Sequence, residues 1–399
     1  MKIDNSNLRG FIYLVSAKGL STVGNLLFIP VALKVLGNST WLMIVTMQAL
    51  ATILSPLVLM FWNKFGPIIN SANSPEQEQA VINRAILQRL LMAILVTVSA
   101  MSILTLLPGI ESKMLLSAAF TSTIFSLLSN EWLYVSKLSF KNLLLNESIP
   151  RFLASVAPLF FLSNVTQVTI YFFMMSMISL FTFLLKYRNG TTSEKVEYLD
   201  PFSVSDKLRY VFLQFVGFLI LFSPVPLINI LDYSNKFEFT FMERFFRMFM
   251  TLLIPISQYA HGQLLNTSEF KKTVRRWIKN MRIINVIIII LFTPLSMAYI
   301  LISNQQANVT KMLPIIIGVL FWVVTTFQNR IVEEVFVLET RNIKQFNGMQ
   351  VSSTIMLSSL VAISAVFRNS LFLLGALILT EMYRYLYMVS KIHRYGKSD

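Results

Sequence analysis

Residues 86–108 read ILQRLLMAILVTVSAMSILTLLP, an apolar run in which Arg89 is the single charged residue. A helix needs ~20 predominantly apolar residues to cross the hydrocarbon core of a bilayer. Runs of this kind recur along the whole chain, separated by short polar connections. The sequence therefore predicts an all-α polytopic membrane protein, so the charged residues inside its apolar runs are the informative ones.

The composition supports a membrane protein. The chain has 399 residues, of which 55% are hydrophobic and 13% are charged, and its mean hydropathy is +0.64. Soluble domains carry about 25% charged residues. At ~20 residues per span, this length holds about a dozen spans and their connections. We expect no separate catalytic domain and no enzyme activity.

Twelve membrane spans account for the apolar runs. We expect them at about residues 11–35, 40–62, 86–108, 114–136, 148–163, 166–186, 210–231, 239–261, 283–303, 312–335, 349–367 and 370–390. The fifth is the shortest, and only a few polar residues at 163–167 separate it from the sixth.

The distribution of Lys and Arg fixes the orientation. Of the 34 Lys and Arg residues, 23 fall in the termini and alternate connections that we place in the cytoplasm, with Arg151 and Lys186 at the adjoining span ends included. The opposite side carries five, namely Lys34, Lys113, Lys236, Lys311 and Arg368. Cytoplasmic loops of membrane proteins are enriched in Lys and Arg. We expect both termini in the cytoplasm, and we attribute the net charge of +15 to topology rather than to nucleic-acid binding.

Two sequence matches suggest a duplicated six-span unit. Leu8-Arg9 and Leu208-Arg209 each precede an apolar run, and Thr52–Pro56 resembles Thr251–Pro255 at nearly the same offset. We expect a parallel 6+6 repeat similar to that of MATE (multidrug and toxic compound extrusion) proteins. The predicted divisions are an N-terminal lobe at 1–187, a cytoplasmic linker at 188–209 and a C-terminal lobe at 210–399.

A polar stretch follows the second span of each half. Ser74 and Gln77 have the spacing of a capping box, which predicts that a helix begins there. The segment Ser268–Arg282 has apolar residues at helical spacing interleaved with basic ones. This pattern is typical of an amphipathic helix in the inner headgroup layer. Interfacial anchoring is its simplest role, and capture of an anionic lipid is the functional alternative.

Metal and cofactor chemistry have little support in the sequence. Cys is absent, which excludes disulfides and thiolate metal sites. The two histidines, His261 and His393, fall at a predicted helix end and in the tail. We expect no metal site and no cofactor.

Lys18 is the most informative charge inside the lipid. A charged side chain at the bilayer centre costs at least ~2.5–3.5 kcal/mol, so it usually faces a protein-lined or wet interior. Lys18 lies roughly 10 Å into the first span, at 1.5 Å per residue, and that span contains no acid. Small residues that let a helix or a substrate approach surround it, namely Ser16, Ala17, Gly19, Ser21 and Gly24.

Other intramembrane charges extend this set. Glu243 and Arg247 can pair at i and i+4 with Arg244 beside them, and Glu381 can pair with Arg384.

We predict a cationic cavity for a phosphate-bearing substrate, with Lys18, Arg244, Arg247 and Arg330 as substrate-binding residues. The ion-coupling candidates are Glu381, Glu131 and Glu243. The alternative is that the Glu–Arg pairs are structural. Arg89 and Glu131 also lie close enough to the cytoplasmic boundary for their side chains to reach water.

The stretch Ser129-Asn-Glu-Trp-Leu-Tyr134 closes the fourth span and leads into a basic turn. With the twelve spans and the short polar N-terminus, it resembles the Wzx-type O-antigen flippases of the multidrug/oligosaccharidyl-lipid/polysaccharide (MOP) superfamily. Val135-Ser136 stand where that family usually has Gln-Gly.

The resemblance implies a bacterial inner-membrane flippase for an undecaprenyl-diphosphate-linked oligosaccharide. Its two lobes would alternate access to a cationic cavity and move the lipid from the inner to the outer leaflet, with coupling to an ion gradient. The implied partners are the bilayer, an O-antigen polymerase and a chain-length regulator.

Two alternatives remain open. A MATE-type or other small-molecule exporter would be expected to carry an acid in its first span, where this chain has Lys18. An integral membrane O-antigen polymerase would carry large periplasmic loops, whereas the outer connections expected here are short.

Overall fold

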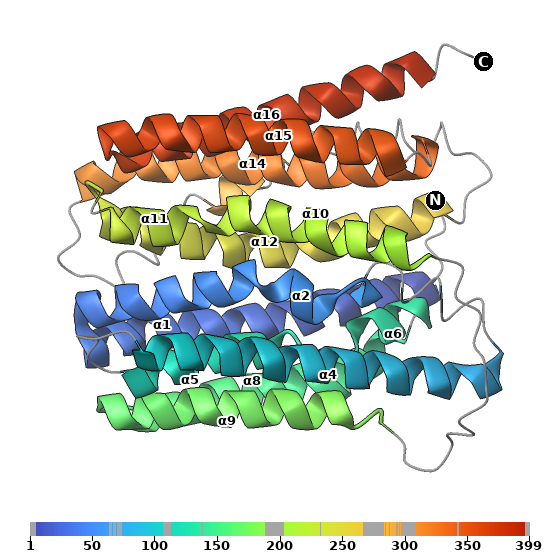
Figure 1. The fold of residues 1–399 in the computed structure, drawn as a ribbon, viewed down its shortest axis with the longest axis horizontal. Coiled ribbons are helices and arrows are strands. Elements are labelled where there is room, and N and C mark those ends of the chain that lie inside the picture. The colour runs from blue at the N-terminus through green and yellow to red at the C-terminus, as the bar shows by residue number, and fades with distance from the viewer. Residues whose placement is uncertain are drawn as a thin grey trace. The chain divides into compact units, whose positions relative to one another are not determined.

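The computed structural model describes most of the chain. It covers residues 5–63, 66, 69, 74–106, 113–137, 139–187, 203–231, 233–265, 283, 285–286, 288–292, 294, 296, 309–340 and 343–395. Every regular element in these residues is a helix (Figure 1). The all-α prediction is therefore confirmed for the described part. The chain divides into two compact units, unit 1 (Met1–Pro226) and unit 2 (Leu227–Asp399).

The first two predicted spans form one interrupted helix in unit 1. Helix α1 (Asn5–Ile53) is 49 residues long, more than a bilayer requires, and non-helical backbone interrupts it at Gly37. Gly37 has φ 74° and ψ 170°, a conformation that glycine adopts readily because it lacks Cβ. The interruption falls where the sequence predicts the connection between the spans. The short helix α2 (Ser55–Leu59) follows.

The predicted capping box is confirmed at the start of α4 (Pro75–Leu106). The backbone N–H of Ser74 donates to Gln77 Oε1 at 3.0 Å, and the backbone N–H of Gln77 donates to Ser74 Oγ at 3.4 Å. These reciprocal bonds satisfy amide groups that have no partner inside the helix. The polar residues before α4 thereby set its first turn.

The fourth and fifth predicted spans are irregular. The fourth consists of α5 (Lys113–Ser126) and α6 (Glu131–Ser136), with a break at 127–130. The fifth is longer than expected and comprises α7 (Phe140–Leu143), a π-helical turn (Leu144–Ser148), α8 (Ile149–Val156) and a 3₁₀ turn (Ala157–Phe161). Helix α9 (Val165–Leu184) matches the sixth span and is capped by Asn164, which accepts from the Gln167 N–H at 3.0 Å.

The remaining helices belong to the second half of the sequence. They are α10 (Val204–Phe222), α11 (Pro224–Ile230), α12 (Lys236–Leu265), α14 (Val309–Thr340), α15 (Ile343–Phe367) and α16 (Ser370–Tyr395). In unit 2, α14 packs against α12 and α16, and α16 also packs against α15 (Figure 1).

Some predictions concern residues outside the described part. The amphipathic segment 268–282 and much of the ninth span lie there, as does the side chain of Arg330. The linker at 188–209 is described only from residue 203, and α10 begins at Val204. The lobe boundaries at 187 and 210 therefore stay a prediction.

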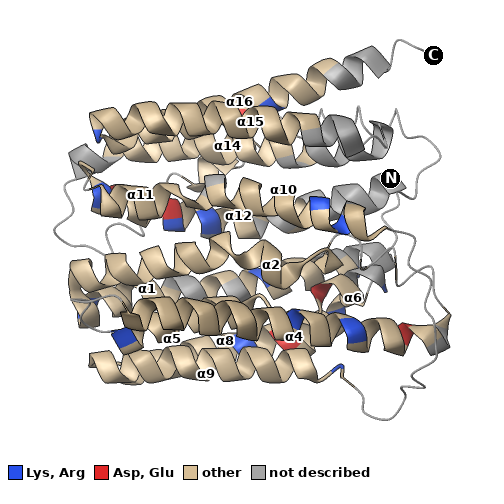
Figure 2. Cartoon of the chain, viewed as in Figure 1, with Lys and Arg blue, Asp and Glu red and all other residues tan. Residues whose placement is uncertain are grey.

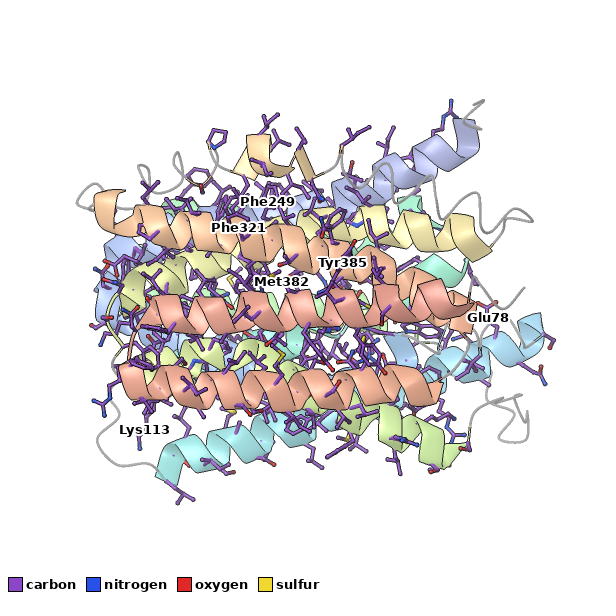
Figure 3. The ribbon with its side chains drawn as sticks, turned by 90° about the horizontal axis from the view of Figure 1, so that it is seen from above. Glu78, Lys113, Phe249, Phe321, Met382 and Tyr385 are labelled. Atoms are coloured by element: carbon purple, nitrogen blue, oxygen red, sulfur yellow. The ribbon has the colours of Figure 1, made fainter. Side chains whose placement is uncertain are left out.

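The described helices suit a bilayer. Five are long and apolar enough to cross one, or six if α10 and α11, which meet at 42°, form one bent span. Charged residues are sparse along the helices (Figure 2). Glu78 and Lys113, before and after the apolar run of α4, lie toward opposite ends of unit 1 (Figure 3). This placement agrees with their predicted cytoplasmic and periplasmic sides.

Gly318 on α14 and Gly375 on α16 allow a matched test of the packing in unit 2. A methyl group at Gly318 would overlap the side chain of Leu374, with Cγ at 3.1 Å, whereas one at Gly375 meets nothing within 4 Å. Overpacking a core costs about 1–3 kcal/mol, and an unhindered Gly→Ala change gains about 0.4–1 kcal/mol. Gly318→Ala should lower the unfolding temperature in detergent, and Gly375→Ala should raise it slightly. Equal shifts of the unfolding temperature in the two variants would contradict the contact between α14 and α16.

Candidate functional site: charged pairs within the helices

Lys18 and Glu131 form an ion pair in unit 1. Lys18 Nζ, on α1, donates to Glu131 Oε2 at 2.6 Å, although the two residues are 113 positions apart in sequence. Their side chains are 20% and 27% exposed. The sequence predicted Lys18 as a substrate ligand and Glu131 as an ion-coupling residue. The structure brings these two candidates into one pair, and Lys18 has an acidic partner from outside its own span.

The break between α5 and α6 places Glu131 in this pair. Glu131 is the first residue of α6, and its backbone N–H donates to Ser129 Oγ at 3.1 Å. The Ser129 hydroxyl donates in turn to Glu147 Oε2 at 2.7 Å, and the Asn130 N–H donates to Glu147 Oε1 at 2.9 Å. The buried carboxylate of Glu147 therefore holds the non-helical residues that precede Glu131.

Arg89 supports the same break from α4. Its side chain donates to the carbonyl oxygens of Ser129 at 2.6 Å and Leu127 at 2.7 Å, and its guanidinium lies 5.2 Å from the centre of the Phe183 ring. A helix end leaves carbonyl groups without helical partners, and in hydrocarbon no water can satisfy them. Arg89 is completely buried, so the expectation that its side chain reaches water is wrong.

Arg151 completes this network from α8. It donates to the carbonyl oxygens of Ser126 at 3.0 Å and Leu128 at 2.6 Å, and its guanidinium lies 3.8 Å from the Glu147 carboxylate. Sequence reasoning missed Glu147, because the predicted fifth span begins one residue after it. We name the three side chains Arg89, Glu147 and Arg151 the break network.

The two predicted pairs of unit 2 are present. On α12, Arg247 Nε donates to Glu243 Oε1. On α16, Arg384 Nη1 lies 3.3 Å from Glu381 Oε1. The amide of Asn329, on α14, donates to the Glu381 carboxylate and, at 2.7 Å, to its backbone carbonyl. Glu381 therefore joins α16 to α14, a contact that sequence spacing could not predict.

The charged pairs differ in which partner is exposed. In three Glu–Arg pairs, the carboxyl side chains are 2–6% exposed and the arginine side chains 15–21% exposed. These pairs are Glu147–Arg151, Glu243–Arg247 and Glu381–Arg384. Arg244 is partly buried beside Glu243 and has interactions of its own. The carboxylates are thus internal, whereas the basic groups are partly accessible.

Unit 1 also contains an apolar cavity of about 300 Å³. Its walls come from α1, α4, α5 and α10, with Ile53 and Phe120 buried and Met101 exposed at the rim. None of the charged candidates lines it, so this cavity suits hydrocarbon rather than an anion. Within the described residues, no cluster of His, Asp or Glu could hold a metal ion.

Glu147 provides a test of the break network. Removing one partner of a buried charge network costs about 3–5 kcal/mol, whereas a surface pair contributes below about 1 kcal/mol. Glu147→Ala should therefore strongly lower the unfolding temperature in detergent. Glu78→Ala, which removes the more exposed pair with Lys137, is the control and should change it little. If both variants unfold at the same temperature, the network does not support the break.

Comparison with known proteins identifies the fold. No family model matches the sequence, and no curated protein matches it in sequence. An outward-facing multidrug resistance MATE family transporter of the MOP superfamily has a TM-score of 0.61 at 13% identity, over 98% of this chain and 96% of that one. A MATE crystal structure in the straight conformation gives 0.62 at 14%, over 98% and 96%.

A third similar structure is described as having a binding pocket of reversed polarity. It is a MOP superfamily transporter from Pyrococcus furiosus, for which a reverse polarity of the binding pocket suggests a different function. Its TM-score is 0.61 at 12% identity, over 98% of this chain and 96% of that one. At these identities the likeness concerns the fold alone. The chain is a membrane protein with the fold of the MATE transporters over nearly its whole length, and every regular element in its described part is a helix.

Proposed function

We propose that this chain is a MOP superfamily transporter that flips an undecaprenyl-diphosphate-linked oligosaccharide from the cytoplasmic to the periplasmic leaflet. The observation that supports it most is that buried carboxylates pair with partly exposed arginines in both units, while Lys18 and its partner Glu131 are both partly exposed. Apart from Glu131, the partly exposed groups of these pairs are cationic, which favours an anionic substrate.

A diphosphate-linked lipid suits these groups chemically. Arginine binds phosphate oxygens in a bidentate manner, and lysine supplies a compact point charge. The polar head group of such a lipid cannot cross hydrocarbon unaided, because unpaired polar groups are costly to desolvate. Lys18, Arg244, Arg247 and Arg330 remain the proposed ligands, reached alternately from the two sides of the membrane.

The fold is compatible with more than one pocket polarity. The Pyrococcus furiosus transporter, with its reported reverse polarity, has an overall structure about as similar to this chain as the multidrug MATE transporters have. Lys18 in the first span is a cation where an exporter of cationic drugs would be expected to have an acid. This contrast supports an anionic cargo for this chain.

The proposal extends to the cellular setting. The protein would lie in the bacterial inner membrane with both termini in the cytoplasm, and an O-antigen polymerase with its chain-length regulator would use the flipped product. Glu381, Glu131 and Glu243 remain the candidates for coupling to an ion gradient. Each has a basic partner, so coupling would require that pair to open.

Export of a small molecule is the second candidate function. The multidrug transporters among the similar structures favour it, as does the apolar cavity of unit 1. This function predicts that loss of the chain alters resistance to a small molecule and leaves surface polysaccharide unchanged.

Replacement of the accessible cations tests the proposed function. Lys18→Ala and Arg247→Ala should reduce surface polysaccharide at least about tenfold, because each removes a charged hydrogen bond to the substrate. Lys18→Arg should retain part of it. Surface polysaccharide is measured in a strain lacking the parent gene, with the amount of inserted protein determined in parallel.

Two variants control for indirect effects. Lys113→Ala removes a cation that lies at the end of unit 1 and donates to the Thr105 carbonyl at 2.9 Å, and it should leave polysaccharide unchanged. Lys18→Ala with Glu131→Gln removes both charges of the pair and should remain inactive. Normal polysaccharide in the Lys18 and Arg247 alanine variants would contradict the assignment of these residues as substrate ligands.

A further inference from the structure

The Lys18–Glu131 pair points to a feature beyond a simple cationic site. We propose that Glu131 is a built-in competitor of the substrate, whose carboxylate occupies Lys18 until an anionic head group displaces it. The inference rests on the proposed function, because it assumes that Lys18 is a ligand of an anion. It assigns Glu131 a specificity role that differs from ion coupling.

The geometry places the two anions in competition for one ammonium group. Glu131 Oε2 lies 2.6 Å from Lys18 Nζ, at the short end of charge-assisted hydrogen bonds. A phosphate oxygen bound to the same ammonium would lie close to this carboxylate, and like charges in proximity repel. In the described part of the chain, Lys18 Nζ contacts no other acid. A bound head group and Glu131 in its present position therefore oppose each other.

The break network allows Glu131 to move without loss of the helix break. Its backbone is fixed, because its N–H is bonded to Ser129 Oγ, and Ser129 is held by Glu147. Its side chain is 27% exposed and can change rotamer. Arg89 and Arg151 donate to the carbonyl oxygens of Ser129 and Leu128, just before Glu131 in sequence, so Lys18 is not the only positive charge near this carboxylate.

Such a competitor would weaken binding of the substrate and speed its release. In the unliganded protein Lys18 is paired, so the ammonium is never left alone in the lipid. A ligand that must first displace an internal partner binds with reduced apparent affinity. The same partner hastens release, because Glu131 returns to Lys18 as the head group leaves. A variant without this competitor should bind the anion more tightly and release it more slowly.

Binding of inorganic pyrophosphate to the purified full chain in detergent tests the competition. Glu131→Gln should lower the dissociation constant about tenfold, a typical size for coupling between two binding events. Glu131→Asp has a shorter side chain and should give a smaller gain. The double variant Lys18→Ala with Glu131→Gln should show no gain in affinity, because it lacks the Lys18 ammonium that would bind the anion. Glu78→Gln neutralises a carboxyl outside the membrane and should bind as the parent does.

A second measurement separates this inference from the proposed function. Flipping of a fluorescent lipid-linked diphosphate oligosaccharide in proteoliposomes should be slower for Glu131→Gln than for the parent. If the parent flips this lipid but Glu131→Gln and Glu131→Asp bind pyrophosphate no more tightly than the parent, the competition is wrong and the proposed function stands. If Glu131→Gln gains affinity but neither protein flips the lipid, the proposed function is wrong and the competition concerns another anion. Absence of pyrophosphate binding by all variants overturns the competition.

Discussion

The interruption of a helix within the fourth predicted span is the constraint on which the rest of unit 1 depends. Residues 127–130 leave helical geometry, and arginines from α4 and α8 donate to the carbonyl oxygens that this break leaves without helical partners. Glu147 offsets part of this positive charge and accepts a hydrogen bond from the backbone N–H of Asn130. The result is a rigid start of α6, which places Glu131 against Lys18.

Local features were predictable from the sequence, and long-range contacts were not. The Ser74 capping box and the Glu243–Arg247 pair depend on residues three or four positions apart, so their spacing alone predicted them. The Lys18–Glu131 pair joins residues 113 positions apart, and its geometry depends on a helix break that hydropathy does not reveal. The sequence placed Arg89 within reach of water, because its distance from the end of the span was known and its carbonyl partners were not.

The division between structural and accessible charges links the structure to the proposed function. Arg89 and Glu147 are buried and hydrogen-bonded to the residues of the break, so their role is to hold the backbone. Lys18 and Glu131 are partly exposed, so they can exchange partners. The composition gives only the total number of charged residues, whereas the structure separates the buried ones from the partly exposed ones. The fold is that of the MATE transporters, and the accessible charges determine which cargo we propose for this chain.

Reconstituted transport is the most direct test of an anionic lipid cargo. The purified protein would be placed in proteoliposomes with a fluorescent undecaprenyl-diphosphate-linked oligosaccharide or with the same sugars on uncharged undecaprenol, and exposure of each lipid on the opposite leaflet would be followed. The account predicts rapid flipping of the diphosphate lipid and little flipping of the neutral one. Equal rates for the two lipids, or no flipping of the diphosphate lipid, would contradict it.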